Sequence, residues 1–274
     1  MILVTGGNGF IGSNLIKCLL NKGHDVTSID NLSTGLKEYE VKGCKYIYDT
    51  IENINAYENK YKIIFHLAAL SRIQPSFNNP IETLNINGYT NILIAEWAKQ
   101  SKLIYSGSSS QWNNPSLSPY STAKKIGEDI FKMYKKVYNC RYEIARFYNV
   151  YGPNELTNEW AAVIGKWRKQ IQKGKKITIV GDGKQKRDFT HVDDIIDGLY
   201  KIAMSHKQHD DAWELGTNKP YSINEVAMLF DHPIVYTPDQ KGNYKSSQRV
   251  NSDAIDRLGW RPKDRLKQYV LQVN

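Results

Sequence analysis

A chain of 274 residues is long enough for one large α/β domain, or for a dinucleotide-binding domain with a smaller second lobe. Hydrophobic residues make up 41% of it and charged residues 24%, close to the globular average, which excludes a disordered or fibrous chain. The net charge of +9 favours anionic partners, but no dense basic arm or nucleic-acid recognition motif chooses among them.

The amino terminus and the cysteines bear on where the protein works. The residues MILVTGGNGFIG carry no basic region and turn rich in glycine after five residues, which is typical of a strand rather than a signal peptide. No apolar stretch approaches the ~20 residues of a membrane helix. Cys18, Cys44 and Cys140 are scattered, which suits a reducing compartment and argues against a structural zinc site. We therefore expect a cytoplasmic protein without a metal.

The first half of the chain alternates short β-branched runs with longer helical segments. This alternation is typical of a parallel sheet with helices on both faces. We expect helices to begin near Gly12, Ile81 and Ser121. The predicted strands cover residues 2–5, 25–29, 45–48, 62–67, 102–106 and 142–147.

Two of these helices carry apolar residues at near-helical spacing. A stripe of this kind is expected to be buried against a core. The stripes consist of Ile86, Tyr89, Leu93 and Trp97 in the first helix, and of Ile126, Ile130, Met133 and Val137 in the second.

The pattern changes after Tyr151-Gly152-Pro153. A helix is predicted over residues 160–173, a strand over 177–180 and another helix from about Asp193, followed by shorter pieces. We expect a Rossmann-type doubly wound sheet in residues 1–150 and a smaller substrate-binding lobe in residues 151–274, with a cleft at the strand ends. Whether the chain crosses back between the lobes is left open.

A glycine pattern follows the first predicted strand. Gly7-x-Gly9-x-x-Gly12 opens a helix, where glycines allow a tight turn, a close approach of the pyrophosphate and close helix–strand packing. The helix amino terminus offers free N–H groups to phosphates. Asp30 stands 18 residues beyond Gly12, at the end of the second strand, where a carboxylate can bond ribose hydroxyls and repel a 2′-phosphate. We therefore expect NAD rather than NADP.

A tyrosine and a lysine stand four residues apart in the segment YSTAK. Tyr120 and Lys124 face the same side of a predicted helix. A nearby ammonium stabilises a phenolate, so the pair makes Tyr120 a candidate general base. The preceding strand supplies hydroxyls at Ser108, Ser109 and Ser110.

At these residues the chain resembles the extended short-chain dehydrogenase/reductases that modify nucleotide sugars, the NAD-dependent epimerase/dehydratase family. It is similar to the UDP-galactose 4-epimerases and the UDP-N-acetylhexosamine 4-epimerases, and the resemblance covers essentially the whole chain. The motifs that carry it are TGGNGFIG, DNLSTG, HLAAL, NING, YSGSSS, YSTAK, RFYNVYGP, GDGKQKRDFTHVDD and LGWRP.

The resemblance implies a role for each matching residue. Tyr120 would be the base, Lys124 would bond the nicotinamide ribose while lowering the tyrosine pKa, and Ser108 or Ser109 would bond the sugar hydroxyl. The implied cofactor site comprises Gly6, Gly9, Phe10, Ile11, Gly12, Asp30, Asn31, Ser33, Thr34, Gly35, Asp49, Thr50, Leu67, Ala68, Ala69, Asn85, Ser106, Tyr120, Lys124 and Tyr148. The implied substrate site comprises Ser108, Asn149, Arg187, Lys241 and Arg249.

The implied reaction is an epimerisation at carbon 4 of a UDP-hexose or UDP-N-acetylhexosamine. Tyr120 would take a hydroxyl proton while hydride leaves the same carbon for NAD, and return of hydride to the other face of the keto-sugar would invert the carbon. A 4,6-dehydratase would need an Asp-Glu pair after its Thr, and many decarboxylases carry Glu at that turn. This chain has Ser108-Ser109-Ser110 there.

Some segments depart from the family pattern. Only 11 residues separate Ser108 from Tyr120, and the usual Tyr-Gly after the serines is Trp112-Asn113. Where relatives carry an Arg-Pro-Gly-Asp stretch whose arginine contacts phosphate, this chain has Gln240-Lys241-Gly242-Asn243. Lys241 or Arg249 would have to take the place of that arginine. A decarboxylase, dehydratase or reductase, and an idle NAD-binding scaffold, stay open as alternatives. The resemblance also implies a homodimer formed through the helices at 81–100 and 121–138.

Overall fold

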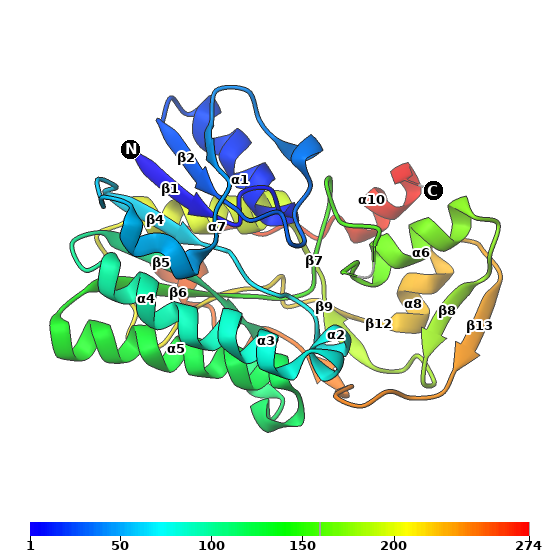
Figure 1. Ribbon diagram of the computed structural model, residues 1–274. Coiled ribbons are helices and arrows are strands. Elements are labelled where there is room, and N and C mark those ends of the chain that lie inside the picture. Colours follow the sequence, from blue (N-terminus) through cyan, green and yellow to red (C-terminus); the bar gives the residue numbers. More distant parts are fainter. Residues whose placement is uncertain (159, 274) are drawn as a thin grey trace.

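The computed structural model describes residues 1–158 and 160–273 and has a seven-stranded parallel sheet at its centre (Figure 1). The strands lie in the order β11-β6-β5-β4-β1-β2-β3, so the order reverses beside β1. This confirms the predicted doubly wound, Rossmann-type sheet, in which ligands bind at the carboxyl ends of the strands. The strands are β1 Ile2–Thr5, β2 Val26–Ile29, β3 Lys45–Ile47, β4 Ile63–His66, β5 Lys102–Ser108, β6 Arg141–Phe147 and β11 Trp213–Leu215.

The inner strands are buried on both faces. Leu3 and Ile64 lie in the core on one side of the sheet, and Val4 and Phe65 lie in the core on the other. All four side chains are fully buried, which explains why these strands are near-continuous apolar runs. The covering helices are α4 Thr90–Trp97 and α5 Pro119–Tyr138 on the first side, and α1 Phe10–Asn21 and α7 Val192–Met204 on the second.

The six strands predicted in the first half are all present, with ends that differ by one or two residues. The largest difference is at β5, which continues to Ser108 and so carries the serines to the edge of the cleft. The seventh strand, Trp213–Leu215, was not predicted, because three residues are too few to show a periodic pattern.

The helix expected from Ile81 is divided. It consists of α3 Pro80–Leu84, a π-helical turn Asn85–Tyr89 and α4. The prediction that Ile86, Tyr89, Leu93 and Trp97 form its buried stripe is right only in part: Leu93 and Trp97 pack against the core, whereas the Tyr89 side chain is 55% exposed. The buried face also carries amides: Asn87 bonds both backbone groups of Leu70, and Asn91 bonds His66.

The stripe expected on α5 is also right only in part, since Ile130 packs against the core. Ile126, Met133 and Val137 are exposed, by 63% for Val137. The buried residues of α5 on the side of the sheet include Ala123, Gly127, Phe131 and Tyr134. The exposed apolar side chains of these neighbouring helices together form one apolar face; they are Ile81, Leu84, Tyr89 and Ile92 in the first segment and Ile126, Met133 and Val137 on α5.

The smaller lobe follows the sixth strand and has its own core (Figure 1). Trp167 and Phe230 pack edge to face at its centre, with Ile179 buried beside them. The strand predicted at 177–180 is confirmed. The elements of this lobe are β7 Val150–Tyr151, α6 Val163–Gln172, β8 Ile177–Val180, β9 Lys186–Asp188, β10 Thr190–His191, β12 Pro220–Ser222, α8 Ile223–Met228, β13 Ile234–Thr237, β14 Ser246–Ser247 and α10 Leu266–Val273; α9 Asp253–Leu258 packs on β11.

The chain returns to the large sheet after it first leaves it. Helix α7 packs on α1, and β11 pairs with β6 in the central sheet. We therefore propose that the large lobe comprises residues 1–149 together with 192–215. The expected division at residue 150 is then the point at which the chain first leaves the large lobe.

Within the described part of the chain, no helix combines the length and the apolar character needed to cross a lipid bilayer.

Candidate functional site

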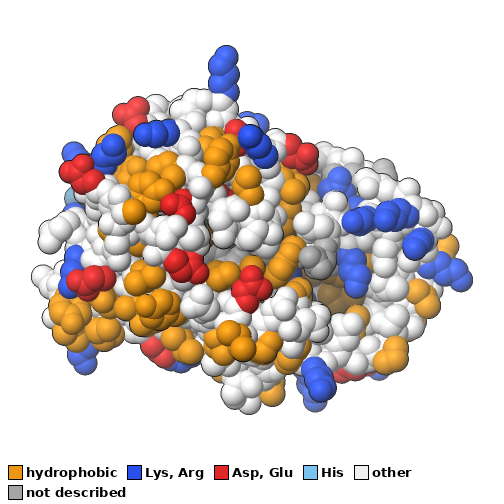
Figure 2. Space-filling view, viewed as in Figure 1, with side chains coloured by type: hydrophobic (Ala, Val, Ile, Leu, Met, Phe, Trp, Pro, Cys, Tyr) orange, Lys and Arg blue, Asp and Glu red, His pale blue; other side chains and the backbone are white. Residues whose placement is uncertain are grey.

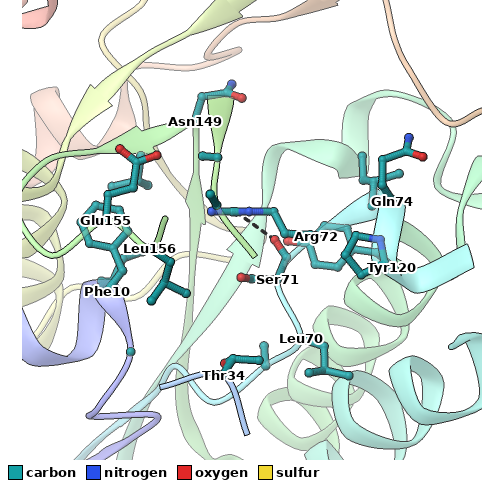
Figure 3. Close-up of a pocket in the computed structure, with 18 of the residues that line it drawn as sticks. Phe10, Thr34, Leu70, Ser71, Arg72, Gln74, Tyr120, Asn149, Glu155 and Leu156 are labelled. Carbon is teal, nitrogen blue, oxygen red and sulfur yellow. Dashed lines mark hydrogen bonds between the residues drawn. The ribbon is translucent and has the colours of Figure 1, made fainter. Parts of the chain in front are cut away.

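A cleft of about 940 Å³ lies at the carboxyl ends of the strands, between the two lobes (Figure 3). The large lobe contributes the ends of β1, β2, β4 and β5, and the small lobe contributes α6, β8 and β9. In the space-filling view the surface is hollowed at this place (Figure 2). The cleft therefore lies where a doubly wound sheet is expected to bind its ligand.

The glycine-rich turn between β1 and α1 can admit a pyrophosphate. Gly6 has φ +71°, a conformation that favours glycine, and a Cβ on Gly12 would lie 2.1 Å from the Gly6 carbonyl oxygen. No side chain of the described residues caps α1, so its first N–H groups are open to a ligand. Of the predicted cofactor residues in this turn, Gly6, Gly9, Phe10, Ile11 and Gly12 all line the cleft.

Two carboxylates follow β2 and β3 in the same part of the cleft. Asp30 accepts the backbone N–H of Asn8 at Oδ2 (2.9 Å) and that of Leu32 at Oδ1 (2.8 Å). Burial raises the pKa of Asp30, and the two N–H groups act against this rise. Asp49 accepts the Tyr57 hydroxyl at 2.6 Å, and this bond lowers the Asp49 pKa. Each Asp30 oxygen keeps a lone pair for a ribose hydroxyl.

Most of the other predicted cofactor residues also line the cleft. They are Asn31, Ser33, Thr34, Thr50, Leu67, Ala68, Ala69 and Ser106. Gly35, Asn85 and Tyr148 lie outside its lining. A Cβ on Gly35 would meet the Asn8 backbone at 2.9 Å, the Asn85 amide donates to Glu52, and the buried Tyr148 hydroxyl donates to Glu214.

Tyr120 lies on the first turn of α5 and points into the cleft beside the end of β5 (Figure 3). Its hydroxyl donates to Ser108 Oγ at 3.5 Å, and Ser108 Oγ is 2.9 Å from Ser110 Oγ. Burial raises the Tyr120 pKa, while the Ser108 hydrogen bond and the charge of Arg72 lower it. The predicted base and its hydroxyl partner are therefore brought together.

Lys124 lies one turn further along α5. Its Nζ donates to the Ser106 carbonyl oxygen at 2.9 Å, and burial lowers the Lys124 pKa to about 8. The charge that lowers the Tyr120 pKa in this structure is that of Arg72, so the expected effect of Lys124 on the phenol stays a prediction. Ser109 is buried and lies 3.4 Å from Ser247 of the smaller lobe, measured between the hydroxyl oxygens.

The shortened loop after the serines is anchored to the core by Trp112. Its indole Nε1 donates to Glu214 at 3.1 Å, and the Arg146 guanidinium lies 4.9 Å from its ring centroid. Arg146 in turn pairs with Glu128 at 2.6 Å and with Glu214 at 3.1 Å. A buried, hydrogen-bonded ion network therefore supports the strand end that presents Ser108.

Of the predicted substrate residues, Asn149 and Arg187 line the cleft from the side of the smaller lobe. Asn149 Nδ2 donates to the Asp188 carbonyl oxygen, and the Arg187 guanidinium lies 4.0 Å from the Tyr244 ring centroid. The structure does not bring Lys241 or Arg249 to the cleft lining.

Among the charged residues of the cleft that sequence reasoning missed are Arg72 and Glu155. Arg72 follows β4, donates from Nε to the Trp160 carbonyl oxygen at 2.7 Å, and is half-buried. Glu155 is 4% exposed, accepts the Gly165 N–H at 3.1 Å, and has its pKa raised by burial to about 7. An arginine six residues after a buried strand, in HLAALSR, was the available signal for Arg72.

The model of the NAD dependent epimerase/dehydratase family matches residues 2–216, from the glycine-rich turn to the end of the seventh strand. The chain belongs to this family. The recognised family and the predicted cofactor, NAD, are thereby confirmed. The glycine-rich turn and Asp30 fit that cofactor, as the contacts above show.

Three relatives of this epimerase/dehydratase chain illustrate its place in the family. A putative UDP-glucose 4-epimerase of Methanocaldococcus jannaschii is 30% identical, with 100% of this chain and 97% of the relative covered. A UDP-N-acetyl-alpha-D-glucosaminuronate decarboxylase of Bacillus cytotoxicus is also 30% identical, with 82% and 77% covered. The crystal structure of the Thermotoga maritima UDP-glucose 4-epimerase with UDP-glucose has a TM-score of 0.91 at 28% identity, with 99% and 97% covered.

Proposed function

We propose that this chain is an NAD-dependent UDP-sugar epimerase that inverts carbon 4 of the sugar through a transient keto-sugar. The observation that carries the proposal is the Tyr120 hydroxyl, 3.5 Å from Ser108, in a cleft that also contains the glycine-rich turn. A base and a hydroxyl donor thus stand beside the site that fits a dinucleotide. The names of the relatives support a UDP-sugar as the substrate.

NAD, when bound, supplies the hydride acceptor and returns the same hydride. The residues of the chain do the rest. Tyr120 takes the proton of the sugar hydroxyl as hydride leaves that carbon, and it gives the proton back after the keto-sugar has turned over. Ser108 holds the reacting oxygen, and Lys124 and Asp30 hold ribose hydroxyls. Asn149 and Arg187 bind the diphosphate from the smaller lobe, where a planar guanidinium can bond two phosphate oxygens.

The serines at the end of β5 favour an epimerase over the other reactions of the family. Elimination of water needs a carboxyl group beside the keto-sugar, and residues 108–112 read SSSQW. Two carboxylates lie near this strand end, Glu128 and Glu214, and both are held by Arg146, at 2.6 and 3.1 Å, which leaves them unsuited to proton transfer. A decarboxylase is the second candidate, because the Bacillus cytotoxicus relative is one by name.

We also propose that the enzyme is a cytoplasmic homodimer. The exposed apolar stripes on residues 80–97 and on α5 form a face that would be covered in a pair of such helices, and Figure 2 shows hydrophobic side chains gathered over α4 and α5. Burial of an apolar face of this kind is the usual driving force for association.

The test is incubation with UDP-, dTDP-, GDP- and ADP-sugars, with the products identified by NMR. We expect 4-epimers from UDP-sugars without net NADH. The Tyr120→Phe variant should lose at least ~100-fold in kcat, because it has no base, while its affinity for NAD stays unchanged. Full turnover by this variant would refute the mechanism, and net NADH or CO₂ release would move the reaction to a dehydrogenase or a decarboxylase.

A further inference from the structure

Arg72 lines the middle of the cleft and has no part in the reaction proposed above. In Figure 3 its side chain reaches across the cleft, with Tyr120 on one side and Asn149 and Glu155 on the other. Nε donates to the Trp160 carbonyl oxygen at 2.7 Å, and Nη1 donates to the Ser71 carbonyl oxygen at 2.9 Å. These two bonds fix the plane of a guanidinium that has five N–H groups, so further donors remain for a ligand.

The charge of this guanidinium is poorly compensated. Among residues 1–158 and 160–273, no carboxylate lies within 4.0 Å of its nitrogen atoms. Glu155 is the carboxyl group that acts on Arg72, but burial raises the pKa of Glu155 to about 7, so it is only partly ionised at neutral pH. The fully ionised acid Asp49 and the buried Asp30 lie at the other end of the cleft, after β3 and β2.

The two anionic parts of the expected ligands have other partners. The cofactor pyrophosphate has the amino terminus of α1, and the substrate diphosphate has Arg187 on β9. Arg72 follows β4 and acts on Tyr120, so it belongs to the reacting end of the cleft. A partly buried cation at this position is costly unless the bound substrate brings an anion to it.

We propose that Arg72 is a specificity-determining residue that binds a carboxylate on the sugar, so that the substrate is a nucleotide-linked hexuronic acid rather than a neutral hexose. This inference rests on the proposed function and narrows its substrate. A planar guanidinium matches the two oxygens of a carboxylate, which a single hydroxymethyl group cannot.

The same contact favours retention of the carboxylate. Loss of CO₂ from the keto-sugar requires the negative charge to move from the carboxylate into the ring. A guanidinium bonded to the carboxylate stabilises the negative charge on the carboxylate before CO₂ is lost. It therefore slows the loss of CO₂ without slowing the return of hydride. We therefore expect the product to be the 4-epimeric hexuronic acid.

The test compares the binding of UDP-glucuronic acid, UDP-glucose and UDP by calorimetry. The protein is loaded with NAD and carries Tyr120→Phe, so that no ligand is consumed. We expect UDP-glucuronic acid to bind at least ~10-fold tighter than UDP-glucose, since hydrogen bonds between two charged groups are stronger than those to a neutral hydroxyl. In Arg72→Gln this preference should disappear, with UDP and UDP-glucose binding within ~3-fold of the parent. Arg72→Lys should retain part of it, because the charge remains without the planar fork.

The matched control is Arg141→Gln, which removes one exposed arginine at the start of β6, far from the cleft lining, and should leave the preference intact. Unfolding curves of all variants show whether they are folded. Equal affinities of the parent for UDP-glucuronic acid and UDP-glucose would overturn the inference. So would an Arg72→Gln variant that loses affinity equally for both nucleotide sugars, or that loses affinity for NAD.

Turnover by the unmodified enzyme separates this inference from the proposed function. If UDP-glucuronic acid yields a UDP-pentose and CO₂, the epimerase proposal and the expected retention of the carboxylate fail, while carboxylate binding by Arg72 stands. If a UDP-hexose is epimerised at least as well as UDP-glucuronic acid, the inference about Arg72 fails while the epimerase proposal stands.

Discussion

At the scale of single residues, the same chemical group has different properties because its surroundings differ. Glu155 and Asp49 are both carboxyl groups of the cleft. Burial raises the pKa of Glu155 to about 7, whereas hydrogen bonds from Tyr57, Asn53 and the Thr50 N–H lower the pKa of Asp49 at the surface. The buried carboxyl group therefore gives the protein a pH dependence near neutrality, and the exposed one does not.

Glu155 should make the protein less stable as the pH rises through its folded pKa. The folded state holds a proton that the unfolded state has already lost above its pKa of about 4.5, so the free energy of unfolding falls between pH 5 and pH 8. Glu155→Gln keeps an oxygen for the Gly165 N–H and removes the titration. We expect it to stabilise the cofactor-free protein by about 2–4 kcal/mol at pH 8 and to change little at pH 5. Urea unfolding at several pH values measures this.

The control for this prediction is Glu58→Gln, which replaces an exposed glutamate. It should leave the pH dependence of the free energy of unfolding as it is in the parent. If Glu155→Gln and the parent show parallel stability curves from pH 5 to pH 8, the carboxyl group is ionised in the folded state at neutral pH and the prediction is wrong.

Asp30 should set the choice of cofactor. Its carboxylate lies where ribose hydroxyls are expected, and a 2′-phosphate would meet its negative charge. We expect NAD to bind at least ~10-fold tighter than NADP, and Asp30→Asn, which keeps an acceptor for one N–H, to reduce this ratio several-fold. Calorimetry with both cofactors gives the two ratios, and equal affinities in the parent would contradict the role of Asp30.

At the scale of elements, periodicity predicts that a face is apolar but not what covers it. The strands β1 and β4 carry apolar side chains on both sides, so their position in a core follows from the sequence. The stripes with Tyr89 and Val137 have the same periodicity, yet these side chains are exposed in the single chain. The buried side of residues 80–97 is mixed: Ile94 and Ala95 pack in the core, and Asn87 and Asn91 satisfy buried backbone and imidazole groups.

The residues of the candidate site also differ in whether the sequence could predict them. Glycine turns and the Tyr120–Lys124 spacing are local patterns, so Gly6, Asp30 and Tyr120 could be placed from the sequence, and the structure brings them to one cleft. Arg72 and Glu155 belong to the cleft only because two lobes meet, and a contact of that kind leaves no periodic signal. Arg249 was expected at the substrate for its charge alone, and the structure places it outside the cleft lining.

The shortened loop should depend on Trp112 for its position. Trp112→Ala removes the donor to Glu214 and the partner that stacks on Arg146, so Ser108 should be held less firmly beside Tyr120. We expect kcat to fall by roughly 10-fold, with a smaller change in KM. Trp112→Phe keeps the ring and should recover most of kcat. A rise in KM alone would show that the loop contributes to substrate binding rather than to the geometry of Ser108.

At the scale of the whole molecule, the two lobes form the cleft together: the large lobe contributes the glycine-rich turn and Asp30, which fit NAD, and the small lobe contributes α6, β8 and β9. The apolar face on residues 80–97 and α5 lies along the lower edge of the large lobe in Figure 1, on helices that cover the outside of the sheet. A partner could therefore cover this face without closing the cleft. A second copy of the chain presents the same helices, which suits a two-fold interface.

The homodimer proposal predicts that charge on this face will separate the subunits. In the double variant Tyr89→Glu and Val137→Glu, both changed side chains are more than half exposed in the single chain, so each subunit should still fold while two like charges are buried at the interface. We expect a dimer for the parent and a monomer for this variant by light scattering at micromolar concentration. Met228→Glu, at an apolar residue of the small lobe that is 72% exposed, is the matched control and should remain dimeric. A monomeric parent would remove the proposal, and a dimeric double variant would place the interface elsewhere on the molecule.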